Sequence, residues 1–161
     1  MVTLSDRQIA DYFHRSYSAV DGLWFMKAEE KYGFDNALEI DIEVWKVLAK
    51  IQARFIKQLV RAEEGIKALH ECFSTKLSIE GFHFTDEMID EGKEFIIRIN
   101  ECPWHNLMIK SGREKLSAKV GTHICTVEYS TWASEFDRNI KFQLGHQICE
   151  GSESCILRFS L

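Results

Sequence analysis

The sequence predicts an α+β fold in which N-terminal helices pack on a small antiparallel sheet, with one long helix inserted between strands. Apolar residues recur at helical spacing through about residue 77, and they alternate with polar residues in short segments after residue 93. A further long helical pattern lies between those segments. The chain has 161 residues, of which 45% are apolar, so we expect one domain over residues 1–161, with a helical half at about 1–77 and a sheet half at about 78–161.

The helical half divides into three helices. Ser5 and Gln8 have the spacing of a capping box, which predicts that a first helix begins there and, after a break or bend at Asp21 and Gly22, ends at Gly33. A second helix is expected over residues 36 to about 63, and a third begins near residue 64. A broad apolar stripe runs along the second helix and consists of Ile40, Val44, Val47, Leu48, Ile51, Phe55, Ile56 and Leu59. Such a stripe can pack against a copy of itself, so we expect a homodimer.

The sheet half begins where the period changes from helical to alternating. Residues 94–100 alternate and predict a strand, and residues 77–84 are a weaker strand candidate. The spacing of Ser111 and Glu114 predicts a capped helix over residues 112–136. The segments NIKFQLGHQI and CILRFSL alternate again, and the loop EGSES joins them as a hairpin.

Charge and composition exclude several classes of partner. With 20 basic and 25 acidic residues the net charge is −5, which repels nucleic-acid phosphates. No apolar run is long enough to span a membrane and the N-terminal segment lacks the pattern of a signal peptide, so we expect a cytoplasmic protein without a membrane partner. Structural disulfides are rare in that reducing compartment, so the five cysteines direct attention to metal binding or thiol chemistry.

Cys149 and Cys155 lie at the two ends of the hairpin loop. The reversal of the chain brings both to the same end of two paired strands, where they form either a zinc-binding thiolate pair or a reduced, unligated pair of small buried residues. On the preceding helix, Cys125 is a better candidate for a further zinc ligand than His123. It shares an apolar face with Tyr129 and Trp132, so we expect that face to meet the sheet.

His146 is the fourth candidate ligand. It precedes Cys149 by three residues, so in an unbroken strand the two side chains point to opposite faces. A bulge, which Gly145 permits, would bring them together. The alternative is a strand histidine that bonds a backbone carbonyl.

The segment CPWH offers different chemistry. Pro103 suits the first position of a helix, which puts Cys102 at the N-cap, where the helix amides stabilise a thiolate. Cys102 is then either a nucleophile with His105 as its base or only a small cap. Trp104 lines a pocket or closes the core, and His83, among aromatic residues, is either a core histidine or a polar group in an apolar pocket.

The C-terminal segment HQICEGSESCILRFSL, taken with Trp104 and with Cys125 on a long helix, resembles the 4-vinyl-reductase-type small-molecule-binding domain over about residues 80–161. The resemblance implies the α/β fold that this family shares with a subunit of the Golgi transport-particle complex, and the ligand-binding role that it has as the input domain of bacterial phenol-sensing regulators. It implies that Trp104 and His83 contact an aromatic ligand. The zinc ligands that it implies are Cys125, His146, Cys149 and Cys155. A histidine stands here in place of an acidic ligand, and the loop between the last two cysteines is shorter than in the sensors.

A second resemblance covers more of the chain. The segment DGLWFMKAEEKYGFDNALEIDIEVW, together with CPWH and the terminal cysteines, looks like small stand-alone proteins of bacteria and archaea, some grouped with the hydrolase that opens 2-aminothiazoline-4-carboxylate. That grouping implies a hydrolase of a cyclic amidine or amide that uses Cys102 or a zinc-bound water. We therefore expect a domain that binds a small hydrophobic or aromatic molecule and carries a structural zinc, with such a hydrolase, using Cys102 and His105, as the alternative.

Overall fold

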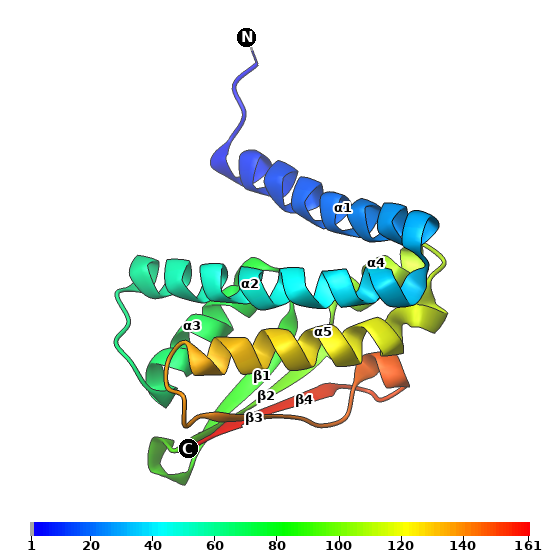
Figure 1. Cartoon of the computed structure of the whole chain (residues 1–161). Coiled ribbons are helices and arrows are strands. Elements are labelled where there is room, and N and C mark those ends of the chain that lie inside the picture. The colour runs from blue at the N-terminus through cyan, green and yellow to red at the C-terminus, as the bar shows by residue number, and fades with distance from the viewer. Residues whose placement is uncertain (1) are drawn as a thin grey trace. The chain divides into compact units, whose positions relative to one another are not determined.

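The structure, a computed structural model, describes residues 2–161, and the chain forms two compact units, Met1–Asp41 and Ile42–Leu161. The first unit holds helix α1 (Asp6–Tyr32) and the start of helix α2 (Phe34–Val60), and the second unit holds the rest of α2 and all later elements (Figure 1). Among the described residues, no helix has the length and apolar character needed to span a membrane.

Helix α1 begins where the sequence predicts. The Ser5 hydroxyl accepts a hydrogen bond from the Gln8 amide at 3.3 Å, and the Gln8 side-chain oxygen accepts one from the Ser5 amide at 2.9 Å, which is the predicted capping box. Gly33, with a φ of 82°, ends the helix. The expected break at Asp21 and Gly22 is wrong, since α1 is helical throughout. One glycine costs a long helix only about 1 kcal/mol, which its neighbours offset.

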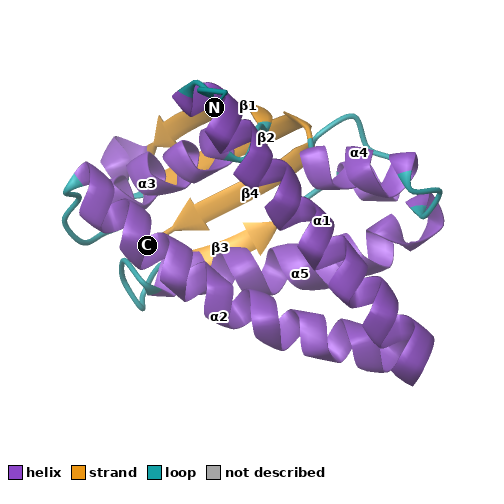
Figure 2. Ribbon diagram, turned by 90° about the horizontal axis from the view of Figure 1, so that it is seen from above, coloured by secondary structure: helices purple, strands orange, loops and turns teal. Residues whose placement is uncertain are grey.

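The second unit contains a sheet of four antiparallel strands. These are β1 (His83–Ile89), β2 (Glu94–Glu101), β3 (Lys141–Leu144) and β4 (Cys155–Ser160), in the order β1-β2-β4-β3 (Figure 2). Leu144 of β3 pairs with Leu157 of β4, and Cys155 at the start of β4 pairs with Ile99 of β2. The predicted strands at 94–100 and 155–161 are therefore present, whereas the strand expected over 139–148 is limited to Lys141–Leu144; the last two strands are antiparallel neighbours as expected.

Helices cover one face of this sheet. Helices α3 (Ile66–Ile79) and α5 (Glu114–Ser134) lie against it, and residues 42–60 of α2 lie on the far side of these two helices (Figure 1). Helix α4 (Pro103–Lys110) joins β2 to α5, while single turns η1 (Asp90–Gly92) and η2 (Ile148–Glu150) lie in the two hairpin connections. The α+β class, with one long helix inserted in an antiparallel sheet, is confirmed.

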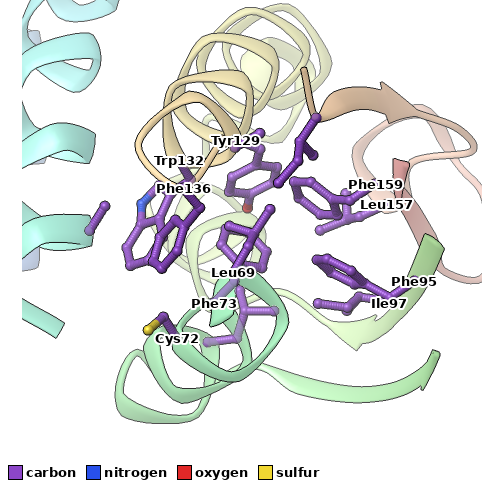
Figure 3. Packing of buried hydrophobic residues seen from close by; sticks show 14 of the residues in the cluster. Leu69, Cys72, Phe73, Phe95, Ile97, Tyr129, Trp132, Phe136, Leu157 and Phe159 are labelled. Carbon is purple, nitrogen blue, oxygen red and sulfur yellow. The ribbon is translucent and has the colours of Figure 1, made fainter. Parts of the chain in front are cut away.

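The alternation in the strands places one sheet face in the core. Phe95 and Ile97 of β2 are completely buried, as are Leu157 and Phe159 of β4. The rings of Phe95 and Phe159 stack with their centroids 4.6 Å apart, and Phe73 of α3 meets Phe159 edge-on at 5.2 Å (Figure 3). These aromatic contacts hold α3 against the two central strands.

Several element boundaries differ from the sequence prediction, and two of the differences have an identifiable physical cause. The strand expected over 77–84 begins only at His83, because Leu77 continues the buried face of α3 and keeps the chain helical. Helix α5 begins after Arg113, which makes no side-chain cap, and Ser111 instead ends α4. The predicted capping box at Ser111 is therefore wrong.

Helix α2 is buried through a face other than its apolar stripe. Its buried residues in the second unit are Trp45, Ala49, Ala53 and Ile56, of which only Ile56 belongs to the stripe. The stripe residues that are exposed in this unit are Val44, Val47, Ile51, Phe55 and Leu59. Two alanines allow α2 to approach its neighbours closely, while the homodimer that the stripe predicts stays a prediction.

Candidate functional site

Four cysteines of the second unit come from four separate segments of the chain. Cys102 directly precedes α4, Cys125 lies in the middle of α5, Cys149 lies in the turn η2, and Cys155 begins β4. All of them are free thiols, as is Cys72 in the core. The antiparallel pairing of β2 and β4 brings the end of β2, and hence Cys102, towards Cys155.

Charge on some of these four thiols raises the pKa of others. Burial is the largest cause that raises the pKa of Cys102 to about 11, and negative charge on Cys155 or on Cys149 raises it as well. The pKa of Cys125 is raised well above its ordinary value by burial, by Glu128, and by charge on Cys102 and Cys155. Burial and charge on Cys155 raise the pKa of Cys149 to about 11. Each of these four thiols thus interacts electrostatically with at least one of the others, and we refer to the four as the thiol cluster.

The turn η2 places Cys149 directly on α5. A β-carbon added to Gly121 of α5 would lie 3.1 Å from the Cys149 sulfur, which is closer than side chains normally pack. The glycine therefore creates the space for this thiol. The Cys149 thiol donates to the Gln147 side-chain oxygen at 3.4 Å, and the Ile148 amide donates to the Cys155 sulfur at 3.2 Å.

The chain bulges at Gly145 and His146, a feature that Gly145 permits. The Gly145 amide donates to the Ile156 carbonyl at 2.8 Å, while the Ile156 amide donates to the His146 carbonyl at 2.9 Å, so two residues oppose one. The bulge does not turn His146 inward, however, because that side chain is exposed. The buried residue is Gln147, whose amide nitrogen donates to the Thr122 hydroxyl of α5 at 3.3 Å.

The electrostatic interactions among the four thiols do not amount to a metal site. Among residues 2–161, no group of three or more His, Cys, Asp and Glu side chains has the arrangement of a metal site. The predicted set of Cys125, His146, Cys149 and Cys155 thus stays a prediction, with its three thiols inside the cluster and its histidine on the surface. Gly121 and Gln147 were not found from the sequence, because neither carries a signal that identifies its tertiary partner.

Cys102 occupies the predicted N-cap of α4. Its sulfur accepts a hydrogen bond from the His105 amide at 3.5 Å, and Pro103 holds the first helical position. The N-cap position predicts an activated thiolate, whereas burial raises the pKa of this thiol by more than the backbone amides lower it. The imidazole Nδ1 of His105 lies 2.8 Å from the Ser117 hydroxyl of α5, which gives the predicted base a different partner.

The two predicted ligand-binding residues lie in different surroundings. Trp104 is half-buried, and its ring meets that of Trp45 edge-on with centroids 5.4 Å apart. His83 has a side chain that is 75% exposed, and its Nδ1 lies 3.2 Å from the Glu101 carboxylate. The expectation of a core or apolar-pocket environment for His83 is therefore wrong, while Trp104 lies at the border between the core and the surface.

A buried charged cluster adjoins the thiols and was not found from the sequence. Lys76 of α3 is 2% exposed, and its ammonium lies 2.5 Å from the Glu128 carboxylate of α5 and 3.0 Å from that of Glu80. Burial alone would lower the pKa of Lys76, but the charges and hydrogen bonds of the two carboxylates raise it above its ordinary value. The amide of Gln52 donates to Glu80 at 3.3 Å. A Lys–Glu pair four residues apart is typical of an exposed helix face, so its burial could not be read from spacing.

Comparison with known proteins identifies a family. The chain belongs to a family of unknown function (DUF6125), whose pattern matches residues 5–155. No curated protein matches the chain. The match includes Cys102, Cys125, Cys149 and Cys155, and the family carries no assigned activity.

Proposed function

We propose that this member of the family is a domain that binds a small hydrophobic or aromatic molecule and is stabilised by a structural zinc ion. The proposal is supported by the position of the turn η2, which places the Cys149 sulfur against Gly121, one turn before Cys125 on α5, and whose Ile148 amide donates to the Cys155 sulfur at 3.2 Å. Cys125, Cys149 and Cys155 supply three of the ligands. Thiolates are soft donors that select zinc among the common divalent ions, so the donor set fits this metal.

The zinc would act on stability rather than on chemistry. Cys149 is half-buried in the turn η2, and its neighbour Ile148 packs against the hydrophobic core. A zinc ion bound by Cys149 together with the thiols on α5 and β4 would hold this turn against the helix. Four protein ligands leave no coordination position for water, so the ion contributes folding energy and no hydrolysis.

Trp104 supports the ligand-binding part of the proposal. Its half-buried indole packs edge-on against Trp45, and part of the ring stays exposed. An indole in this position can offer apolar area to an aromatic ligand. Because Trp104 lies two residues after Cys102, the thiol cluster and the proposed ligand contact share the start of α4.

Zinc binding is tested by thermal unfolding before and after chelation. Chelation should lower the midpoint by several degrees, and added zinc should restore it. Cys149→Ser should show the lowered midpoint and no response to either treatment. Cys72→Ala is the matched control: Cys72 is fully buried in the core, away from the cluster, so this variant should lose stability and keep its zinc response. A wild-type midpoint that ignores both chelator and zinc would refute the structural zinc.

Ligand binding is tested with a panel of phenols and apolar aromatic compounds. A compound that binds should raise the unfolding midpoint of the wild type and lose this effect in Trp104→Ala. Trp24→Ala is the control, because Trp24 is 57% exposed in the first unit. If a compound raised the unfolding midpoints of both variants equally, Trp104 would not be part of the binding site.

The alternative function is hydrolysis of a cyclic amidine or amide such as 2-aminothiazoline-4-carboxylate. It is favoured by one observation, the position of the Cys102 sulfur at a helix N-terminus, where it accepts the His105 amide. The raised thiol pKa opposes it. Formation of carbamoyl-cysteine, the product of adding one water to open the ring, by the wild type and its loss in Cys102→Ser would favour the hydrolase, and absence of turnover would dismiss it.

A further inference from the structure

We infer that two copies of this chain pair through the exposed side of α2, with the two helices antiparallel about a two-fold axis. The residues on this side in the second unit, which we call the exposed α2 face, are Val44, Val47, Ile51, Phe55 and Leu59. The inference gives the homodimer expected from the sequence an orientation and a set of residue contacts. It depends neither on the zinc nor on the ligand of the proposed function.

The exposed α2 face is a continuous apolar surface. Its five side chains are 48–61% exposed, and their steps of three, four, four and four residues form one row along about four turns of helix. The opposite side of the helix is turned towards α3 and α5 (Figure 1) and buries Trp45, Ala49, Ala53 and Ile56. Monomeric proteins rarely expose a contiguous apolar surface of this kind, so a partner that covers it is stabilised by its burial.

Charged side chains flank the exposed α2 face on one side only. Between residues 42 and 60, every charged residue belongs to a second row with steps of three or four residues: Glu43, Lys46, Lys50, Arg54 and Lys57. The acidic residue comes first in this row, and the basic residues follow it. In an antiparallel pair about a two-fold axis, this row faces the same row of the second copy in reverse order. The acidic start of each row therefore meets basic residues of the other.

The apolar residues set the register of the pair. A two-fold axis near residue 49 places Val44 opposite Phe55 of the second copy, and Val47 opposite Ile51 of the second copy. The same register places Glu43 beside Arg54 of the second copy. Both side chains are accessible for this contact, since Glu43 is 70% exposed and Arg54 is 65% exposed. The two-fold axis repeats the contact, so the interface contains two such ion pairs.

Arg54 can hold a second carboxylate. Its Nε and Nη2 donate to the Glu135 carboxylate at 2.6 and 3.1 Å, and a guanidinium has five N–H donors. The contact with Glu135 also limits the motion of the Arg54 side chain, which lowers the entropy cost of a further ion pair. Glu43 lies 3.6 Å from the Lys46 ammonium, a surface contact that is readily exchanged.

An anionic membrane is the other surface that suits an apolar row beside basic residues. The charges favour the second copy. Arg54 and Lys57 already pair with Glu135 and Glu64, which reduces their attraction for lipid phosphates. The net charge of −5 also opposes binding to anionic lipid.

Analytical ultracentrifugation of the full chain over a range of protein concentrations tests the interface. The wild type should dimerise. Ile51→Glu puts a charge in the centre of the apolar row and should raise the dissociation constant of the dimer at least about tenfold. Ile79→Glu is the matched control, because Ile79 is 63% exposed at the end of α3 and Ile51 is 59% exposed; its dissociation constant should equal that of the wild type.

Charge reversal tests the orientation of the two helices. Glu43→Lys and Arg54→Glu should each dimerise about tenfold more weakly than the wild type, because like charges then meet twice in the interface. An equimolar mixture of the two variants should dimerise more strongly than either alone, because both contacts then join opposite charges. In a parallel pair, positions 43 and 54 lie about 16 Å apart along the axis, so mixing would restore nothing.

The outcomes decide between the second copy and other occupants of this face. A wild-type chain that stays monomeric at every concentration would overturn the inference. If that monomer bound phosphatidylserine vesicles and Ile51→Glu did not, the face would belong to a membrane. A dimer that withstands Ile51→Glu would place the interface elsewhere, and a mixture without recovery would overturn the antiparallel arrangement.

Discussion

Replacement of Lys76 by methionine should destabilise the protein severely. Methionine keeps an unbranched side chain of similar length and removes the ammonium. The variant then buries the carboxylates of Glu80 and Glu128, whose side chains are 9% and 5% exposed, without their counter-charge. Removing one partner of a buried ion pair costs roughly 3–5 kcal/mol, a large share of the ~5–15 kcal/mol that stabilises a typical domain.

Urea unfolding followed by circular dichroism measures this loss, and two further variants identify its cause. Lys67→Met removes an exposed lysine from the same helix and should change the free energy of unfolding by less than about 0.5 kcal/mol. In a Glu128→Gln background, Lys76→Met should cost at least about 1 kcal/mol less than in the wild type, because one uncompensated charge is gone. A loss below about 1 kcal/mol for Lys76→Met alone would show that the buried cluster is not formed.

Three further changes have defined outcomes. Gly121→Ala should displace the Cys149 sulfur, which lies 3.1 Å from the new β-carbon, and should weaken zinc binding by about tenfold in a chelator competition. Gly22→Ala is the control, because its β-carbon meets no atom within 4 Å; it should stabilise helix α1 by about 0.5–1 kcal/mol and leave zinc binding unchanged. Phe73→Ala should cost about 3–5 kcal/mol in urea unfolding, because this ring is completely buried against Phe159; a loss under about 1 kcal/mol would contradict the packing. His83→Ala should change the free energy of unfolding by less than about 0.5 kcal/mol, and aromatic compounds should raise its unfolding midpoint as they do in the wild type. Loss of that rise in the variant would show that His83 contacts the ligand.

Local patterns predicted most of the fold. The Ser5 capping box, the glycine that ends α1 and the proline that begins α4 act through contacts within a few residues, so the sequence alone identifies them. Alternation gave the core faces of β2 and β4 for the same reason. The failures came where tertiary packing competes with a local signal, as at Leu77, which continues the buried face of α3 into a segment with strand-like composition.

The candidate site was predictable only in part. Cys149 and Cys155 were brought together by a hairpin, which is a local feature. Cys102 reaches the same cluster through the β2–β4 pairing, which joins segments more than fifty residues apart and leaves no mark on spacing. Lys76 was missed because its partner Glu128 lies on another helix. Burial, which decides the role of these groups, is a property of the assembled fold.

The proposed function depends most on the structural zinc ion. Native mass spectrometry of the full chain, purified without added chelator, measures bound zinc directly, with Cys149→Ser as comparison. We expect one zinc per wild-type chain and none in the variant. A wild-type chain whose mass equals that of the polypeptide alone, even after incubation with zinc, would contradict it.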